Sequence, residues 1–121
     1  MSRIRSKDTR IELLLAKALR AAKIRYRRHP AVLGTPDFLV FSGKHKALVF
    51  VDGDFWHGWD YERRKKRLPP FWREKIKRNM SRDVKQRGVL RKKGWKVLRV
   101  WEHQILASPE KCAAMAAAIL D

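Results

Sequence analysis

The chain has very little cysteine and comparatively few acidic side chains. Among its 121 residues there is one cysteine, Cys112, and Asp and Glu together number 12. A single cysteine excludes an internal disulfide and a multi-cysteine zinc site. We therefore expect Cys112 to be a small buried core residue, in a reducing, cytoplasmic setting.

Long apolar runs are also missing. No segment approaches the roughly 20 consecutive apolar residues that a membrane-spanning helix needs, and none combines one basic face with one large apolar face, as membrane-surface helices do. Residues 1–10 are charged with no apolar stretch behind them, which does not fit a secretory signal. No internal repeat is present. We expect a single domain, residues 1–121, that acts as a monomer away from membranes.

Positive charge is what the chain has in excess. Lys and Arg number 30, and the formal net charge is +18. Such a balance predicts a polyanionic partner, with nucleic acid first. Hydrophobic residues make up 45% of the chain, which is enough for one real core. Three classes of function stay open at this point: a DNA enzyme, a non-catalytic DNA-binding module, and a basic RNA-binding or ribosome-associated protein.

Hydrophobic periodicity predicts an α/β fold, a mixed β-sheet with helices around it. The chain order is helix, edge strand, two hairpin strands, helix, strand, helix. A capping-box spacing at Thr9 predicts that the first helix starts there, with residues 2–8 as a basic arm before it. The other predicted elements are an edge strand at 24–29, a loop at 30–36, strands at 38–41 and 47–51, a basic loop at 58–70, helix 70–93, strand 95–101 and a helix from 108.

Acidic residues mark both ends of the predicted hairpin. Asp37 starts one strand and Asp52 ends the next, so a hairpin brings the two within a few ångströms. Two close carboxylates in so basic a chain are a ready site for Mg²⁺, which prefers oxygen ligands. Magnesium beside a phosphate can polarise it and activate water, with His57 near enough in sequence to move a proton. The alternative is that Pro-Asp and Asp-Gly simply form turns.

Several motifs in a fixed order resemble one family of enzymes. They run from Ile4–Thr9 with Glu12, through Pro36-Asp37-Phe38, Phe50–His57, Phe71-Trp72-x-x-Lys75-Ile76-x-x-Asn79 and Arg82-Asp83, to Gly94–Glu102. Together they resemble the very short patch repair (Vsr-like) DNA endonucleases over about residues 3–106. The resemblance implies the restriction-endonuclease-like PD-(D/E)xK fold. It also implies Mg²⁺-dependent hydrolysis of one strand of double-stranded DNA beside a T·G mismatch, leaving a 5′-phosphate.

The resemblance also implies roles for individual residues. Asp37 matches a metal-binding aspartate, and Val51 matches a position whose backbone carbonyl is a metal ligand. His57 matches a catalytic histidine. Glu12 and Asp83 match acidic residues of the family's active site. The aromatic side chains that wedge between base pairs in the family are matched by Phe55, Trp56 and Trp72.

Departures from the family pattern concern two places. Asp52 stands where mismatch-repair members have a second histidine, so we expect it to replace a proton-transfer group by a metal ligand. The family's structural zinc ligands are replaced by Asp54, Trp59, Tyr61 and His103. These changes bear on T·G specificity more than on cleavage. A homing-type or defence nuclease on the same fold is therefore a further possibility.

Other interpretations of the same side chains remain open. Glu12 has capping-box spacing from Thr9, Trp72 lies on an apolar helix row suited to core packing, and Asp83 has basic neighbours to pair with. Phe55 and Trp56 would point to opposite faces if extended, one into the core and one outward. The predicted phosphate contacts are Lys75, Arg78, Arg82 and Lys85 on one helix face, and Arg3 and Arg5 in the arm.

Overall fold

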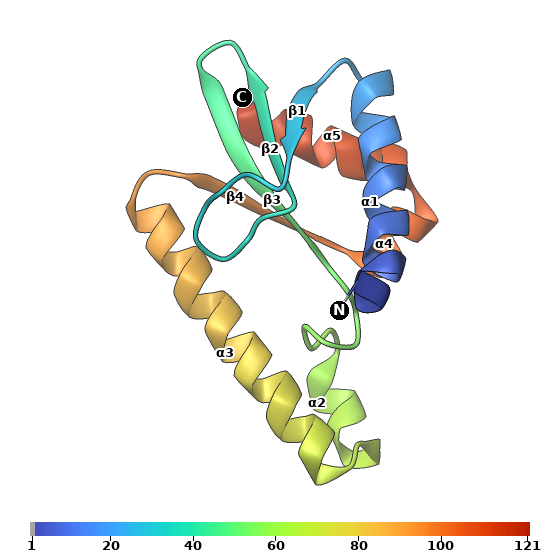
Figure 1. Ribbon diagram of the computed structural model, residues 1–121. Coiled ribbons are helices and arrows are strands. Elements are labelled where there is room, and N and C mark those ends of the chain that lie inside the picture. Colours follow the sequence, from blue (N-terminus) through green and yellow to red (C-terminus); the bar gives the residue numbers. More distant parts are fainter. Residues whose placement is uncertain (1) are drawn as a thin grey trace.

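A computed structural model describes residues 2–121, with side chains from residue 10 onward. Its elements are α1 (Ser2–Ala21), β1 (Arg25–Arg28), β2 (Phe38–Ser42), β3 (His45–Asp52), α2 (Tyr61–Arg64), η1 (Lys65–Arg67), α3 (Pro70–Lys92), β4 (Lys96–Trp101), α4 (Glu102–Ala107) and α5 (Pro109–Leu120) (Figure 1). The strands form one sheet in the order β1-β2-β3-β4. The first three strands are antiparallel and β4 is parallel to β3, which confirms the predicted mixed sheet.

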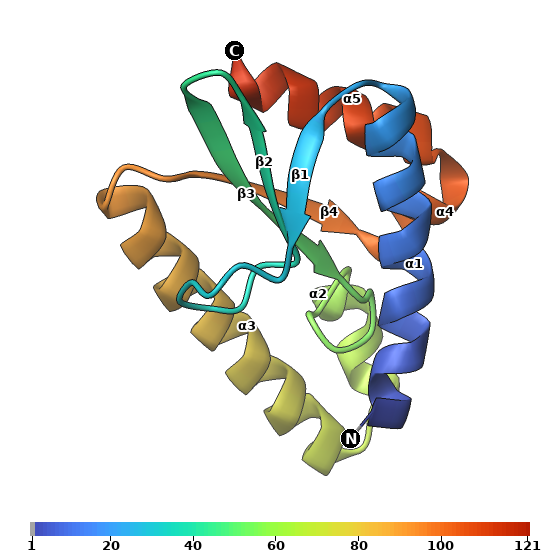
Figure 2. The ribbon, with the colours of Figure 1, turned by 45° about the horizontal axis from the view of Figure 1, so that its top comes forward.

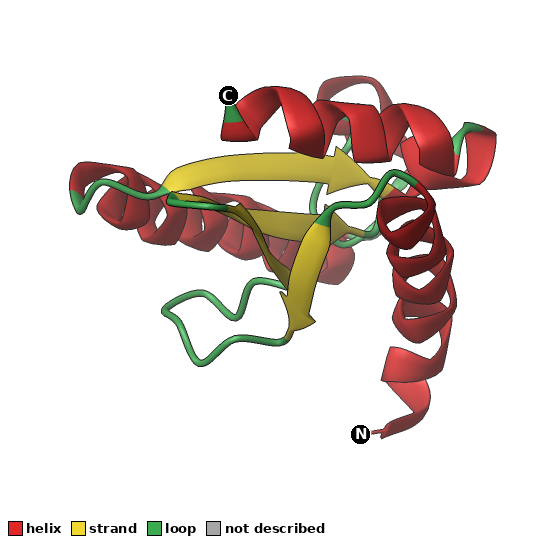
Figure 3. Ribbon diagram, turned by 90° about the horizontal axis from the view of Figure 1, so that it is seen from above, coloured by secondary structure: helices red, strands yellow, loops and turns green. Residues whose placement is uncertain are grey.

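Two layers of helix enclose this sheet. Val49 and Val51 of β3 face α1, α4 and α5 in the larger core cluster, whereas Leu48 and Phe50 face the other side, where they pack with Leu90 of α3. The β3 strand is thus buried on both faces, as its nearly continuous apolar run predicts. Seen from above, α5 and α3 lie on opposite sides of the strands (Figure 3).

The first helix begins earlier than the sequence indicates. Since α1 starts at Ser2, residues 2–8 are its first turns rather than a separate arm, and Thr9 lies inside the helix, where it cannot be the N-cap. No proline or glycine in this segment breaks a helix, and its Arg and Lys residues are good helix formers. The side chains of Arg3 and Arg5 lie outside the described residues.

The segment 58–70 and helix α3 also differ from what the sequence predicts. The segment 58–70 is not a plain loop, because it contains α2 and η1. The spacing of Trp72, Ile76, Met80 and Val84 predicts that these four residues form the buried row of α3, but Val84 is 72% exposed. The buried row is instead Ile76, Asp83, Arg87 and Leu90. The two charged members face inward because Asp83 pairs with His57 and Arg87 pairs with Asp52 of β3.

Cys112 is buried in the α1–α5 core, as expected. Burial, together with the nearby Glu110 carboxylate, raises the pKa of its thiol, so Cys112 is a packing residue. Within residues 2–121, no helix combines the length and the apolar character that a bilayer crossing requires.

Candidate active site

A pocket of about 780 Å³ opens where β2 begins and β3 ends. Its walls come from α1, the loop 29–37, the end of β3 and the middle of α3. In Figure 2 that loop arches from the end of β1 toward α3. The lining includes all six residues predicted to carry the chemistry: Glu12, Asp37, Val51, Asp52, His57 and Asp83. The structure therefore brings together side chains that are up to 71 positions apart in the sequence.

Asp37 and Glu12 form the acidic half of this pocket. The Asp37 Oδ2 accepts a hydrogen bond of 2.6 Å from the backbone N–H of Val51, and the Asp37 backbone N–H donates to the Val49 carbonyl at 3.0 Å. Burial raises the pKa of Asp37 to about 8, and the neighbouring Glu12 and Asp52 carboxyls add to the rise. Glu12 and Asp37 also lie with His29 in a group whose ligand atoms are within 4.8 Å of one another.

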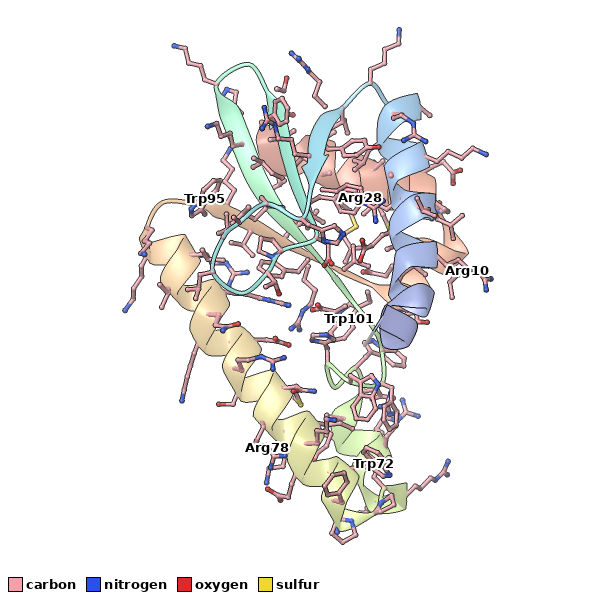
Figure 4. All side chains as sticks on the ribbon, viewed as in Figure 1. Arg10, Arg28, Trp72, Arg78, Trp95 and Trp101 are labelled. Carbon is pink, nitrogen blue, oxygen red and sulfur yellow. The ribbon has the colours of Figure 1, made fainter. Side chains whose placement is uncertain are left out.

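Two basic side chains contact Glu12. The Arg28 Nη2 donates to its Oε1 at 2.6 Å, and the His29 Nε2 lies 3.1 Å from the same oxygen. Arg28 reaches inward from the end of β1 (Figure 4). The alternative that Glu12 belongs to a capping box is therefore wrong: Glu12 is 5% exposed, lies in mid-helix and faces the pocket.

Asp52 lies in the same pocket but among arginines. Its Oδ2 accepts from the Arg87 Nη1 at 2.6 Å and from the Arg99 Nε at 2.7 Å, while its Oδ1 accepts from the Arg87 Nη2 at 2.9 Å. Asp52 is 2% exposed and Arg87 is 6% exposed. The Arg87 guanidinium also stacks 4.0 Å from the centre of the Phe50 ring. Asp52 thus anchors two cations beside the acidic half.

His57 and Asp83 form a third part of the site. The His57 Nδ1 lies 2.7 Å from the Asp83 Oδ2 and 3.6 Å from the Asp52 Oδ1. Burial alone would raise the pKa of Asp83, but the His57 hydrogen bond and the charge of Arg87 outweigh it, so the pKa is lowered. This geometry suits a carboxylate that orients an imidazole.

The sequence interpretation missed four members of this site: Arg28, His29, Arg87 and Arg99. In the sequence they are four cations among 30 Lys and Arg and 4 His. Nothing local distinguishes them from solvated charges. Their roles depend on the order of the strands and on the angle at which α3 crosses the sheet, which no sequence spacing specifies.

Aromatic side chains form an exposed cluster beside the pocket. The ring of Trp56 lies 4.7 Å from that of Phe55 and 5.2 Å from that of Trp72, and Phe71 continues the row at 5.0 Å from Trp72. Phe55 is 38% exposed and Trp56 is 36% exposed. The expectation that one of these two is a core residue is wrong, because residues 53–60 form turns in which strand alternation does not apply.

A tight turn holds this cluster against α3. Gly58 has a φ of +82°, which favours glycine, and a Cβ there would overlap the Met80 side chain. The Asn79 side chain donates to the Trp56 carbonyl at 3.0 Å. Trp72 lies at the α2 end of the molecule (Figure 4) and is part of neither core cluster.

The positions that the resemblance assigns to zinc ligands also meet in space. The His103 Nδ1 lies 2.9 Å from the Asp54 Oδ1, and the His103 ring lies 4.5 Å from the Trp59 ring. Tyr61, two residues after Trp59, is buried in α2. A hydrogen bond and an aromatic contact therefore join the segment 53–61 to the start of α4.

We predict that this connection needs no zinc. EDTA should leave the melting temperature unchanged, and elemental analysis of the purified protein should find much less than one zinc per chain. A tightly held structural zinc needs four ligands, mostly thiolates and imidazoles, and the cluster has one imidazole, His103, and no thiolate. Calorimetry with and without EDTA makes the measurement. Stoichiometric zinc, or a large drop in melting temperature on chelation, would contradict the prediction.

A mixed sheet that carries clustered carboxylates at the junction of a hairpin, in a strongly basic chain, defines a nuclease of the restriction-endonuclease-like class. Residues 1–63 match the family model described as DNA mismatch endonuclease Vsr. The chain belongs to this family of DNA endonucleases.

Curated relatives agree along most of the chain. A type II nicking enzyme of Neisseria meningitidis serogroup C, V.NmeDIP, is 44% identical over 113 residues, which cover 90% of this chain and 75% of the relative. The type II nicking enzyme V.HpaIIP of Haemophilus parainfluenzae is 44% identical over 88% of this chain and 77% of its own length. The DNA mismatch endonuclease Vsr of Escherichia coli is 36% identical over 84% and 66%.

Proposed function

We propose that this endonuclease uses Mg²⁺ to nick one strand of double-stranded DNA, leaving a 5′-phosphate, and that its site is a T·G mismatch in DNA repair. The observation that carries the proposal is the pocket that joins Asp37 and Glu12 to the His57–Asp83 pair. Nicking, rather than double-strand cutting, is supported by similarity to relatives that are named nicking enzymes. A non-catalytic DNA-binding module is disfavoured, because clustered carboxylates would only repel phosphate.

The acidic half of the pocket suits a divalent cation. Asp37, with Glu12 beside it, presents the hard oxygen ligands that Mg²⁺ prefers, and the family resemblance adds the Val51 carbonyl. Burial raises the pKa of Asp37 to about 8, with the Glu12 and Asp52 carboxyls adding to the rise, so the ionised form of Asp37 needs positive charge beside it. A cation would supply that charge. When bound, Mg²⁺ polarises the phosphate and lowers the pKa of water.

His57 and Asp83 handle the proton. A carboxylate that accepts from Nδ1 holds the proton on that nitrogen, so Nε2 of the neutral ring is the atom that can accept a proton from water or, once protonated, give one to the leaving oxygen. Because Asp83 is itself within 3.7 Å of Arg87 and of Arg82, it stays ionised and keeps the imidazole oriented. Asp83 is thus a positioning residue, and His57 is the catalytic one.

Duplex DNA would be held by two surfaces next to the pocket. The exposed cations of α3 predicted to contact phosphates are Lys75, Arg78, Arg82 and Lys85. Arg78 points away from the body of the molecule (Figure 4). The cluster of Phe55, Trp56 and Trp72 supplies the aromatic wedge. Lys75 lies 4.9 Å from the Trp56 ring centre, which places a cation for phosphate beside an aromatic face for bases.

A plasmid assay tests the proposed function directly. Supercoiled plasmid carrying a T·G mismatch is incubated with the protein and Mg²⁺, and in parallel with EDTA. The expected result is open circles that form only with Mg²⁺. DNA ligase should seal these nicks, and prior phosphatase treatment should prevent sealing, because ligase needs a 5′-phosphate. Linear plasmid would show that the protein cuts both strands rather than one. No Mg²⁺-dependent product on any duplex would overturn the proposal.

We predict that Trp56→Ala weakens binding and cleavage of a T·G duplex by about tenfold or more relative to a matched duplex. An indole wedged between two base pairs offsets the few kcal/mol that unstacking those pairs costs. A mismatched base step costs less to unstack, so it admits the indole more readily. Affinity and cleavage of both duplexes are measured at one salt concentration, because phosphate contacts depend on salt. Phe71→Ala, at the outer end of the same aromatic row, is the control. Equal losses on the two duplexes would remove Trp56 from mismatch recognition.

A further inference from the structure

A second concave surface lies at the opposite end of the sheet. It is a groove of about 330 Å³ lined by Lys44, His45, Lys46, Lys93, Gly94, Trp95 and Lys96, called the lysine groove below. Trp95, labelled at the turn between α3 and β4 in Figure 4, packs against the smaller core cluster and gives the groove a fixed wall. No acidic residue is among the lining residues.

Among residues 10–121, no acidic side chain pairs with the lysines of this groove. Its four lysines come from the β2–β3 hairpin, the end of α3 and the start of β4, and among the side chains that the structure describes none of them is in an ion pair. Basic residues in the last turn of a helix can compensate its dipole, which accounts for Lys93. It does not account for Lys44, Lys46 and Lys96, which extend from strands and a turn.

The approach to the groove is open. A Cβ added at Gly43 or at Gly94, in the two turns that border it, would meet nothing within 4 Å. Four like charges converging on an open concavity repel one another, and a polyanion is the ligand that would relieve that repulsion. A backbone phosphate is the group whose size and charge fit lysine side chains with no acceptor among them.

The helix α3 connects this groove to the active site. Arg82, Gln86 and Lys93 lie within about 40° of one another around the helix axis, so they share one face. Arg82 and Gln86 line the active-site pocket, and Lys93 lines the groove. From Arg82 to Lys93 the helix rises by about 16 Å, which is roughly five base pairs of duplex.

We propose that the lysine groove binds backbone phosphates of the same DNA duplex, about five or more base pairs from the bond that is cleaved. This inference rests on the proposed function, since it takes duplex DNA as the ligand of the pocket. It adds a second contact region on the flanking DNA, which gives no base specificity and extends the length of duplex that the protein needs. The long β3 strand sets the spacing, because Lys46 and Asp52 lie near its opposite ends.

The test compares two variants with the same net charge. Replacing Lys44, Lys46, Lys93 and Lys96 by Gln empties the groove of its lysines. Replacing Arg10, Lys17, Lys23 and Lys111 by Gln removes as many exposed charges from the α1 and α5 side. Binding to duplexes of about 10 and about 24 base pairs, each with the mismatch centred, is measured without divalent metal over a range of salt concentrations. Melting temperatures check that both variants are folded.

Wild-type protein and the α1–α5 control should bind the longer duplex more tightly, with a steeper salt dependence than for the shorter one. The groove variant should lose that gain, and its slope of log affinity against log salt should be shallower by about 3 on the longer duplex. Equal slopes and equal length dependence for both variants would overturn the proposal. The proposal would also be overturned if the groove bound a second duplex, that is, if wild type bound two duplexes of either length and the groove variant bound one. Because no metal is present, the outcome is independent of whether the protein cleaves.

Discussion

Asp37→Asn is expected to lower the rate of DNA cleavage by about 10³-fold or more while affinity for duplex DNA stays the same or rises. An amide cannot replace the carboxylate as a cation ligand, and Lewis-acid and water-activation effects together account for several kcal/mol of transition-state stabilisation. Above the pKa of Asp37 the variant also lacks a negative charge that would repel phosphate, and below that pKa the pocket charge without metal is unchanged. The amide oxygen can still accept from the Val51 N–H, which now holds Asp37 at 2.6 Å, so the hairpin should keep its shape.

The pH dependence separates this effect from a loss of structure. Burial holds the pKa of Asp37 at about 8, above its ordinary value of 3.8, so between these two values the folded protein binds the proton that the unfolded chain releases. Metal-free stability should therefore fall as pH rises from about 4 to about 8, and the Asn variant should lose part of that fall. For the same reason Mg²⁺ binding near pH 7 should release close to one proton in wild type.

Single-turnover cleavage, binding without metal and proton release in buffers of different ionisation enthalpy make the three measurements. Asp60→Asn, which changes an acidic residue outside the pocket and near the exposed Arg63, is the matched control. Cleavage by Asp37→Asn within tenfold of wild type would remove Asp37 from the metal site. A loss of cleavage together with a loss of DNA binding would point to misfolding instead.

The parts of the site that could be predicted are those that neighbouring elements of the chain build. Asp37 and Asp52 lie at the two ends of one hairpin, and the alternation of β2 and β3 puts both on the α3 side of the sheet. The fold class follows from the same strand patterns. The capping spacing at Thr9 is a weak local signal, so it predicts too late a start for α1 and also a capping role for Glu12.

Partners that meet only through tertiary packing could not be predicted. Arg87 is 35 positions from Asp52, and Arg99 is 47 positions away on a strand that pairs parallel to β3 after a long crossover. On a helix with so many cations, nothing in the local sequence marks Arg87 as buried. Strand alternation predicts one buried and one exposed ring for Phe55 and Trp56, but the residues that follow β3 turn at once toward α2.

Asp52→Asn should destabilise the protein and slow cleavage by about 100-fold or more, yet leave Mg²⁺ affinity close to that of wild type. The sequence predicts that Asp52 is a metal ligand, and that remains a prediction. The contacts favour a different role, since both carboxylate oxygens already accept hydrogen bonds from Arg87 and Arg99. Removing one partner of a buried ion pair costs about 3–5 kcal/mol, and here it would leave Arg87 at 6% exposure without its carboxylate.

Loss of this anchor would also release His57, whose Nδ1 is 3.6 Å from the Asp52 Oδ1. The measurements are thermal unfolding, Mg²⁺ titration and the pH profile of cleavage, for Asp52→Asn alone and combined with Arg99→Gln. The double variant should recover part of the lost stability, because it removes one of the two cations that the single variant leaves uncompensated. If Asp52→Asn weakens Mg²⁺ binding as much as Asp37→Asn does, Asp52 is a direct metal ligand and the arginine contacts are secondary. If Asp52→His keeps most of the activity, the position instead moves protons, as a histidine there would.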